Sequence, residues 1–176
     1  MVARLDVLAA AGPVDDHDAV ATAAAVFLDE IGGTSGPLLG LLLDAVARAL
    51  PPGPVDAARG WLAGLADGTA AIQRVGEAEP GDRTLVDALD AARAAAGDGH
   101  AGAALRAALA ATVVTAGLVA RRGRSSYLGE RSIGVPDPGC VGICLLLWSL
   151  TRVVEPAAAA DWSDAAALVA ATVPPR

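Results

Sequence analysis

The segment from His100 to Arg121 has the sequence HAGAALRAALAATVVTAGLVAR. Alanine and leucine, which head the scale of helix propensity, dominate it, and it contains no proline. Apolar residues would lie on nearly every face of the resulting helix, which predicts a buried position near the centre of the core. The segment therefore indicates an all-α protein that is built around it.

The rest of the chain has the same character. Of its 176 residues 54% are apolar and only 3% are aromatic, so small aliphatic side chains must form the core. Clusters of glycine and proline separate further helical segments, and the sequence shows no alternating strand pattern. We expect a single domain over residues 1–176, with helices at residues 18–31, 37–50, 55–75, 84–96, 100–121, 139–154 and 157–173.

Charge and composition exclude several classes of function. A net charge of −7 argues against a protein that binds nucleic acid or an anionic membrane. All 13 basic residues are arginine, which excludes a phosphate-binding loop or catalysis that depends on lysine. Cys140 and Cys144 lie in an apolar run and are predicted to be buried free thiols, and two histidines are too few for a zinc site. The sequence shows no signal peptide and no membrane span, so we expect a cytoplasmic protein.

Polar residues are concentrated in three segments between the expected helices, at residues 32–36, 76–84 and 121–139. The last of these carries four arginines in an otherwise acidic protein. If the three segments met at one end of a helical bundle, they would present backbone N–H groups, helix N-termini and arginines together. That combination is suited to binding a phosphate group.

Each polar segment also has a purely structural interpretation. Thr34 or Ser35 could cap a helix at a corner between two helices, and Asp137 could cap the helix that follows it. Glu130 could pair with a neighbouring arginine in a solvated loop. Thr84 and Asp87 have the spacing of a capping box, although aspartate replaces the usual glutamate or glutamine.

Three motifs together resemble the L subunit of dihydroxyacetone kinase, which also occurs as the second domain of single-chain ATP-dependent kinases of that family. The motifs are Gly32-Gly33-Thr34-Ser35-Gly36-Pro37-Leu38, Glu79-Pro80-Gly81-Asp82-Arg83-Thr84, and the segment from Ala120 to Gly139. They are long and correctly ordered, and the resemblance covers most of the chain. It implies an up-and-down antiparallel barrel or bundle of about six to seven helices that holds ADP or ATP at one end.

The resemblance also implies roles for individual residues. Thr34 and Ser35 would contact the phosphates, Gly76 and Leu85 would border the base, and Arg124 would approach the nucleotide. Asp137, Pro138 and Gly139 would flank the adenosine. The implied partner is a subunit that binds dihydroxyacetone, with ATP or a phosphorylated carrier protein as the phosphate donor; a homodimer is one alternative for the oligomeric state.

The sequence departs from the family at its start, where the family carries a Gly-Asp-x-Asp-His-Gly loop and a preceding aspartate that hold magnesium. Counting back from Gly32, residues 1–18 correspond to the helix and linker that follow this loop. Asp15, Asp16 and Asp18 are then interpreted as a helix start, so no metal ligand is predicted and the family's first helix and metal loop would precede Met1.

The sequence leaves three functions open. The first is a nucleotide-binding phosphotransfer subunit that works with a dihydroxyacetone-binding partner. The second is a catalytically silent binding or regulatory module that uses the same loops, which the missing aspartates favour. The third is a helical protein that retains only the fold. Whether this chain alone is an enzyme is left open, because phosphoryl transfer depends on metal ions at the phosphate oxygens.

Overall fold

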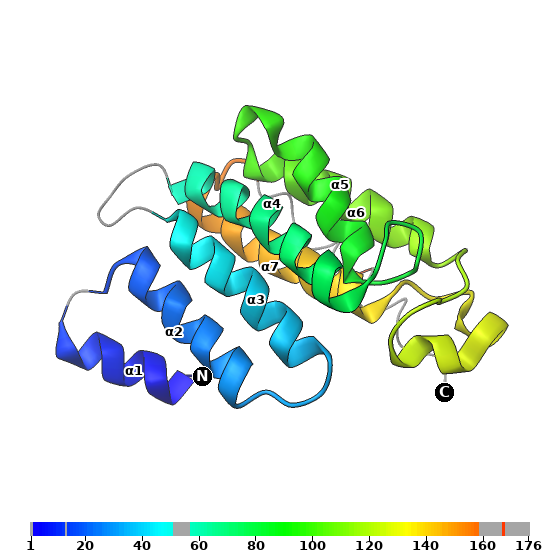
Figure 1. The fold of residues 1–176 in the computed structure, drawn as a ribbon. Coiled ribbons are helices and arrows are strands. Elements are labelled where there is room, and N and C mark those ends of the chain that lie inside the picture. Colours follow the sequence, from blue (N-terminus) through cyan, green and yellow to red (C-terminus); the bar gives the residue numbers. More distant parts are fainter. Residues whose placement is uncertain (1, 13, 51–56, 159–166, 168–176) are drawn as a thin grey trace. The chain divides into compact units, whose positions relative to one another are not determined.

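The computed structural model describes residues 2–12, 14–50, 57–158 and 167. These residues form helices and connecting loops, which confirms the expected all-α fold (Figure 1). The chain divides into two compact units, Met1–Gly76 and Glu77–Arg176. Within the described ranges, no helix has the length and apolar character needed to cross a membrane.

The first unit contains the helices α1 (Val2–Ala11), α2 (Asp16–Asp29), α3 (Ser35–Ala49) and α4 (Ala57–Gly76). Helix α3 packs between α2 and α4 in sequence order. The α2–α3 contact is built from small and medium apolar side chains, with Phe27 and Trp61 partly buried at its margin. The buried members of this cluster are Val20, Ala24, Leu43, Val46, Ala47 and Leu50.

The contact between α3 and α4 depends on glycines at every fourth position of α4. Gly60, Gly64 and Gly68 all lie on the buried face of α4. A Cβ atom at Gly64 would lie 2.3 Å from the Cα atom of Val46 on α3, which is far inside van der Waals contact. The two backbones can therefore approach closely only because these side chains are absent.

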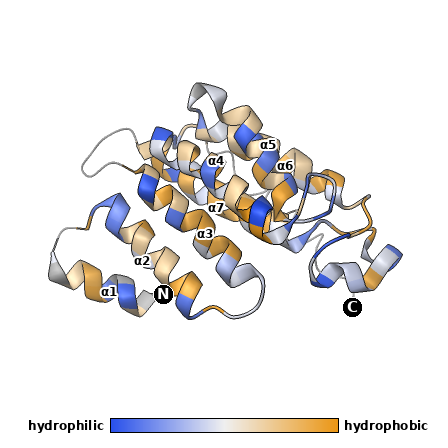
Figure 2. Cartoon of the chain, viewed as in Figure 1, coloured by the Kyte–Doolittle hydropathy of each residue, from blue (hydrophilic) through white to orange (hydrophobic). Residues whose placement is uncertain are grey.

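The second unit contains α5 (Leu85–Ala95), the short 3-10 helix η1 (Ala96–Asp98), α6 (Ala101–Thr115), the 3-10 segment η2 (Arg124–Ser132) and α7 (Pro138–Val154). Helices α5, α6 and α7 pack against one another in all three pairs. Colouring by hydropathy shows α7 as largely hydrophobic, whereas η2 mixes hydrophilic and hydrophobic residues (Figure 2). The predicted buried thiols are confirmed, since Cys140 and Cys144 are both buried and free.

Helix α6 differs from the expectation in length and in burial. It ends at Thr115 rather than Arg121, and Val113 and Val114 are 57% and 64% exposed, so it is not apolar and buried on every face. Its buried face consists of small residues and two threonines: Ala101, Gly102, Ala104, Leu105, Ala108, Thr112 and Thr115. The segment from Arg122 to Pro138, expected to be a loop, contains η2. The last expected helix, 157–173, falls almost entirely outside the described residues.

Candidate functional site

The N-terminal ends of α5 and α7 lie side by side in the second unit. Thr84 and Asp87 form the predicted capping box of α5, with the Thr84 N–H donating to Asp87 Oδ2 over 2.8 Å. Asp137 caps α7 as predicted, because its Oδ2 accepts from the Cys140 N–H over 3.0 Å. The Cys140 thiol donates to the Thr84 carbonyl over 2.9 Å and so joins the two helix starts. Two sets of helix N-terminal N–H groups, each with partial positive charge, therefore meet in one place.

Gly139 allows this close approach. A Cβ atom at Gly139 would lie 2.8 Å from Asp137 Oδ2 and 3.2 Å from the Cβ atom of Leu85. The structure thus brings together Leu85 and the Asp137-Pro138-Gly139 triplet, four of the predicted site residues. Leu85 is buried and Pro138 is exposed, so the triplet reaches the surface beside the start of α5.

Asp137 is only 6% exposed. Burial raises the pKa of its carboxyl, and this exceeds the opposing effects of the hydrogen bond from Cys140 and of the positive charge on Arg83. Its backbone N–H donates to Thr115 Oγ1 over 2.9 Å. Hydrogen bonds of the Asp137 backbone and carboxyl therefore hold the residue between the end of α6 and the start of α7.

The polar segment before α5 is folded back onto that helix. The Gly81 N–H donates to Asp87 Oδ1 over 2.6 Å, and the Glu79 N–H donates to Asp82 Oδ2 over 3.0 Å. The Asp82 carbonyl accepts from the Arg121 N–H over 3.0 Å. The second and third predicted polar segments are thereby brought together.

We call residues 116–137, between α6 and α7, the arginine loop. Arg121 lies 3.8 Å from an Asp82 carboxyl oxygen, and Arg122 lies 3.5 Å from Glu77 and 3.9 Å from Asp82. These pairings link the loop to the segment before α5. The two carboxylates of Glu77 and Asp82 balance the two positive charges of Arg121 and Arg122.

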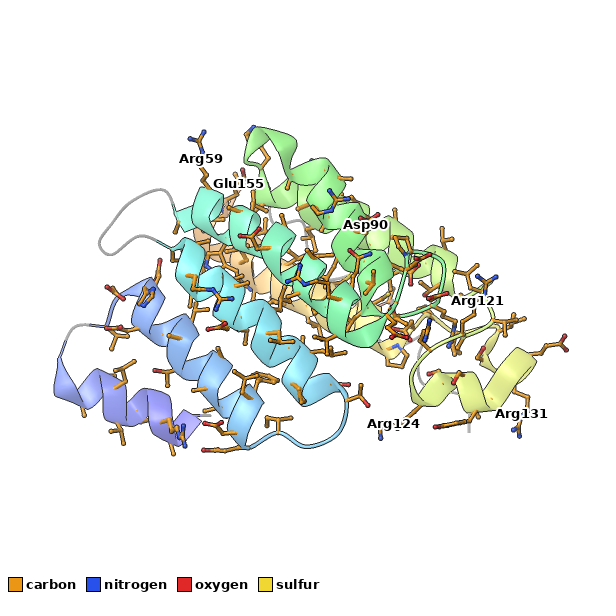
Figure 3. The ribbon with its side chains drawn as sticks, viewed as in Figure 1. Arg59, Asp90, Arg121, Arg124, Arg131 and Glu155 are labelled. Atoms are coloured by element: carbon orange, nitrogen blue, oxygen red, sulfur yellow. The ribbon has the colours of Figure 1, made fainter. Side chains whose placement is uncertain are left out.

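The outer part of the arginine loop is exposed. Arg124 and Arg131 extend away from the ribbon of η2 (Figure 3), and Tyr127 is 85% exposed. The Arg124 guanidinium is thus free to reach a ligand on this side of the second unit. An arginine offers a planar fork of N–H groups that matches a phosphate group.

The remaining predicted site residues belong to the first unit. Thr34 occupies the N-cap position of α3 but its side chain makes no capping hydrogen bond, and Ser35 is the first residue of that helix. Both are exposed, which leaves their hydroxyls and the first N–H groups of α3 available. Gly76 is the last residue of α4.

The aspartates near the start of α2 form a helix start, as the sequence indicated. Asp15 is the N-cap of α2 and its Oδ1 accepts from the Asp18 N–H over 2.8 Å. In the part of the chain that the structure describes, no three His, Cys, Asp or Glu side chains come together in a way that could hold a metal ion.

Sequence reasoning missed the most buried charged residue of this site. Arg83 lies inside the Glu79–Thr84 motif, but the spacing of that motif indicated only a turn and a cap. In the structure its guanidinium donates to the carbonyls of Thr115, Ser132 and Val135. No local signal predicts this, because the partners lie 32, 49 and 52 residues away in sequence.

Comparison with known proteins identifies the family of the chain. The family described as the DAK2 domain matches residues 1–152. The chain is 39% identical over 129 residues to L-erythrulose 1-kinase of Mycolicibacterium smegmatis, which covers 69% of this chain and 23% of that protein. It is 34% identical over 139 residues to human triokinase/FMN cyclase, covering 74% of this chain and 24% of that protein.

A shorter relative is matched over more of its length. The ADP-binding subunit DhaL of the PTS-dependent dihydroxyacetone kinase of Lactococcus lactis is 37% identical over 132 residues, which cover 74% of this chain and 65% of the subunit. The chain spans less than a quarter of the two longer kinases. Since the family match extends over residues 1–152, the chain belongs to the DAK2 domain family.

Proposed function

We propose that this chain binds ADP or ATP and acts as the nucleotide-binding phosphotransfer subunit of a dihydroxyacetone-type kinase. The observation that carries the proposal is the pair of joined N-termini of α5 and α7, which lie in the same unit as the exposed Arg124. Helix N-termini and arginine are both suited to anions. The related subunit DhaL of Lactococcus lactis is named as an ADP-binding subunit.

Within this proposal the predicted residues keep their roles. Thr34 and Ser35 contact the phosphates, Gly76 and Leu85 border the base, and Arg124 approaches the nucleotide. Asp137, Pro138 and Gly139 flank the adenosine, where a buried carboxyl can accept hydrogen bonds from hydroxyl groups. These assignments come from the resemblance and are tested one residue at a time.

The first test is a calorimetric titration of the purified chain with ADP, with and without magnesium. We expect saturable binding of one nucleotide per chain. Arg124→Ala should weaken binding on the order of tenfold, because it removes a charge-assisted hydrogen bond of about 1.5–3 kcal/mol. Arg131→Ala is the matched control, since it removes the same charge from the same loop and should have a smaller effect.

The outcomes of this titration separate the alternatives. An equal loss of affinity in both variants would indicate a general electrostatic effect and contradict the role of Arg124. Absence of ADP binding both with and without magnesium would contradict the proposed nucleotide binding. It would favour a binding module of the same fold. Affinity that depends on magnesium would indicate metal ligands outside the described residues or on the nucleotide itself.

The second test concerns the partner and the phosphate donor. We propose a dihydroxyacetone-binding kinase subunit as the partner, which holds a triose or ketose while phosphate is transferred to its hydroxyl group. Phosphorylated product is measured after mixing this chain with such a subunit and either ATP or a phosphorylated carrier protein. Product with one donor only would identify the donor, and ADP binding without product from either would support a catalytically silent module.

A further inference from the structure

Arg83 has an unusual position for an arginine. Its side chain is only 2% exposed, although the residue belongs to a polar segment before α5. Its backbone has a φ of +60°, in the left-handed region that side chains other than glycine rarely adopt. The backbone thus accepts an unfavourable conformation that directs the side chain inward rather than toward solvent.

The guanidinium of Arg83 joins three segments of the second unit. Its Nε donates to the Thr115 carbonyl at the end of α6 over 3.1 Å. Its Nη2 donates to the Ser132 carbonyl over 2.6 Å and to the Val135 carbonyl over 2.9 Å, both in the last part of the arginine loop. One cation therefore holds the point where the arginine loop leaves α6 and the point where it returns to α7.

Other hydrogen bonds close the same region. The Gly134 N–H donates to the Ala116 carbonyl over 2.8 Å, and the Asp137 N–H donates to Thr115 Oγ1 over 2.9 Å. The Ala120 N–H donates to Ser132 Oγ over 3.1 Å. These bonds hold the two ends of the arginine loop together and so close its base. The carbonyls of Thr115, Ser132 and Val135 take no part in them and accept from the Arg83 guanidinium instead.

The chemistry of this base requires a donor that satisfies several carbonyls at once. Without donors, the two buried carbonyls of Thr115 and Ser132 and the partly buried carbonyl of Val135 would carry an uncompensated desolvation cost. A planar guanidinium has five N–H donors in a fixed geometry and keeps its charge when buried. Arg124 and Asp137 both belong to the loop whose base is closed in this way, yet neither is among the three carbonyl partners of Arg83.

We propose that Arg83 is a positioning residue, whose guanidinium closes the base of the arginine loop and so holds Arg124 and Asp137 in place for the nucleotide. The proposal rests on the function proposed above. Arg83 itself does not contact the nucleotide, because its side chain is buried among the backbone carbonyls of the loop. Its loss should therefore act on the loop first and on nucleotide affinity through the loop.

The test uses the full-length chain with Arg83→Met, which keeps bulk but removes the donors, and Arg83→Lys, which restores a buried cation. Arg93→Met is the matched control, because Arg93 forms an exposed pair with Asp90 on α5. Amide hydrogen exchange is measured by NMR at Gly134, Asp137 and Arg121 in the arginine loop, and at Leu89 in the core of α5. ADP affinity is measured by calorimetry at a temperature where circular dichroism shows every variant folded.

We expect Arg83→Met to speed exchange at the three loop amides by at least about tenfold relative to Leu89, and to weaken ADP binding on the order of tenfold. Arg83→Lys should recover part of both losses, and Arg93→Met should change neither. Equal acceleration at all four amides, or unchanged loop protection with unchanged affinity, would overturn the proposal. If the wild-type chain does not bind ADP, the nucleotide function fails, and the exchange ratio alone still decides whether Arg83 closes the loop.

Discussion

At the scale of single residues, Asp137 combines burial with a capping role. The residue is 6% exposed, and its carboxyl accepts a hydrogen bond from the Cys140 N–H at the start of α7. Burial raises the pKa of this carboxyl, so the negative charge is less favourable here than in water. The cap needs an oxygen that accepts a hydrogen bond, and it does not need the charge.

Asp137→Ala should therefore lower the free energy of unfolding by about 1 kcal/mol, the usual effect of removing a helix cap. Asp137→Asn keeps an acceptor oxygen of similar size and should lower it by less. Urea denaturation of both variants measures the difference. An equal loss for asparagine and for alanine would show that the charge, rather than the acceptor oxygen, stabilises this helix start.

At the scale of secondary-structure elements, the contact between α3 and α4 depends on the absence of a side chain at Gly64. Gly64→Ala would place a Cβ atom 2.3 Å from the Val46 Cα atom, and backbone atoms cannot move aside without separating the helices. We expect the free energy of unfolding to fall by about 1–3 kcal/mol or more. Denaturant titration, with circular dichroism as the readout, measures the loss.

Gly142→Ala on α7 is the matched substitution with the opposite expected sign. A Cβ atom at this exposed helical position would meet nothing within 4 Å. Alanine should stabilise the helix by about 0.5–1 kcal/mol, because glycine loses more backbone freedom on folding. If Gly64→Ala also stabilised the chain, helix propensity rather than close packing would explain the result at Gly64.

The start of α6 and the end of α7 are joined by Glu155. Its Oε2 accepts from the Gly102 N–H over 2.9 Å, and its Oε1 lies 2.8 Å from His100 Nδ1. The carboxylate thus satisfies an N–H group of the first turn of α6 from 53 residues away in sequence. The hydrogen bonds from Gly102 and His100 lower the pKa of Glu155.

This lowered pKa predicts a dependence of stability on pH. The ionised form is favoured by folding, so the stabilisation is complete above the unfolded glutamate pKa of about 4.3 and is lost as the pH falls through the lower folded value. Glu155→Gln should reduce the free energy of unfolding at neutral pH, and the difference from wild type should shrink in acid. A difference that stays constant from neutral pH to below pH 4.3 would contradict the role of the charge.

At the scale of the whole molecule, nucleotide binding should raise the free energy of unfolding of the chain. A ligand that binds only the folded chain raises the free energy of unfolding by about 2.7 kcal/mol at 100 times its dissociation constant. We expect ADP to raise the melting temperature and to slow amide exchange in residues 32–38 and 120–139. Arg124→Ala should show a smaller shift at the same ADP concentration, and an unchanged melting temperature in wild type would contradict binding.

Much of the candidate site could be predicted from the sequence because its signals are local. The capping box of Thr84 and Asp87 and the cap at Asp137 depend on residues within three positions of one another, and both are confirmed. The same holds for Asp15 at the start of α2. The assignments of all eight predicted site residues to the nucleotide remain predictions, because they depend on a ligand.

The sequence by itself determined that the chain is helical and where most helices begin, because propensity and capping act between residues close along the chain. Only the tertiary structure decided that α6 ends at Thr115 and that Arg83 is buried. The carbonyl of Thr115 binds Arg83 and its hydroxyl binds Asp137, and these partners are distant in sequence. A hydrophobic pattern cannot reveal such hydrogen bonds, since they form only when packing brings separate segments together and excludes water.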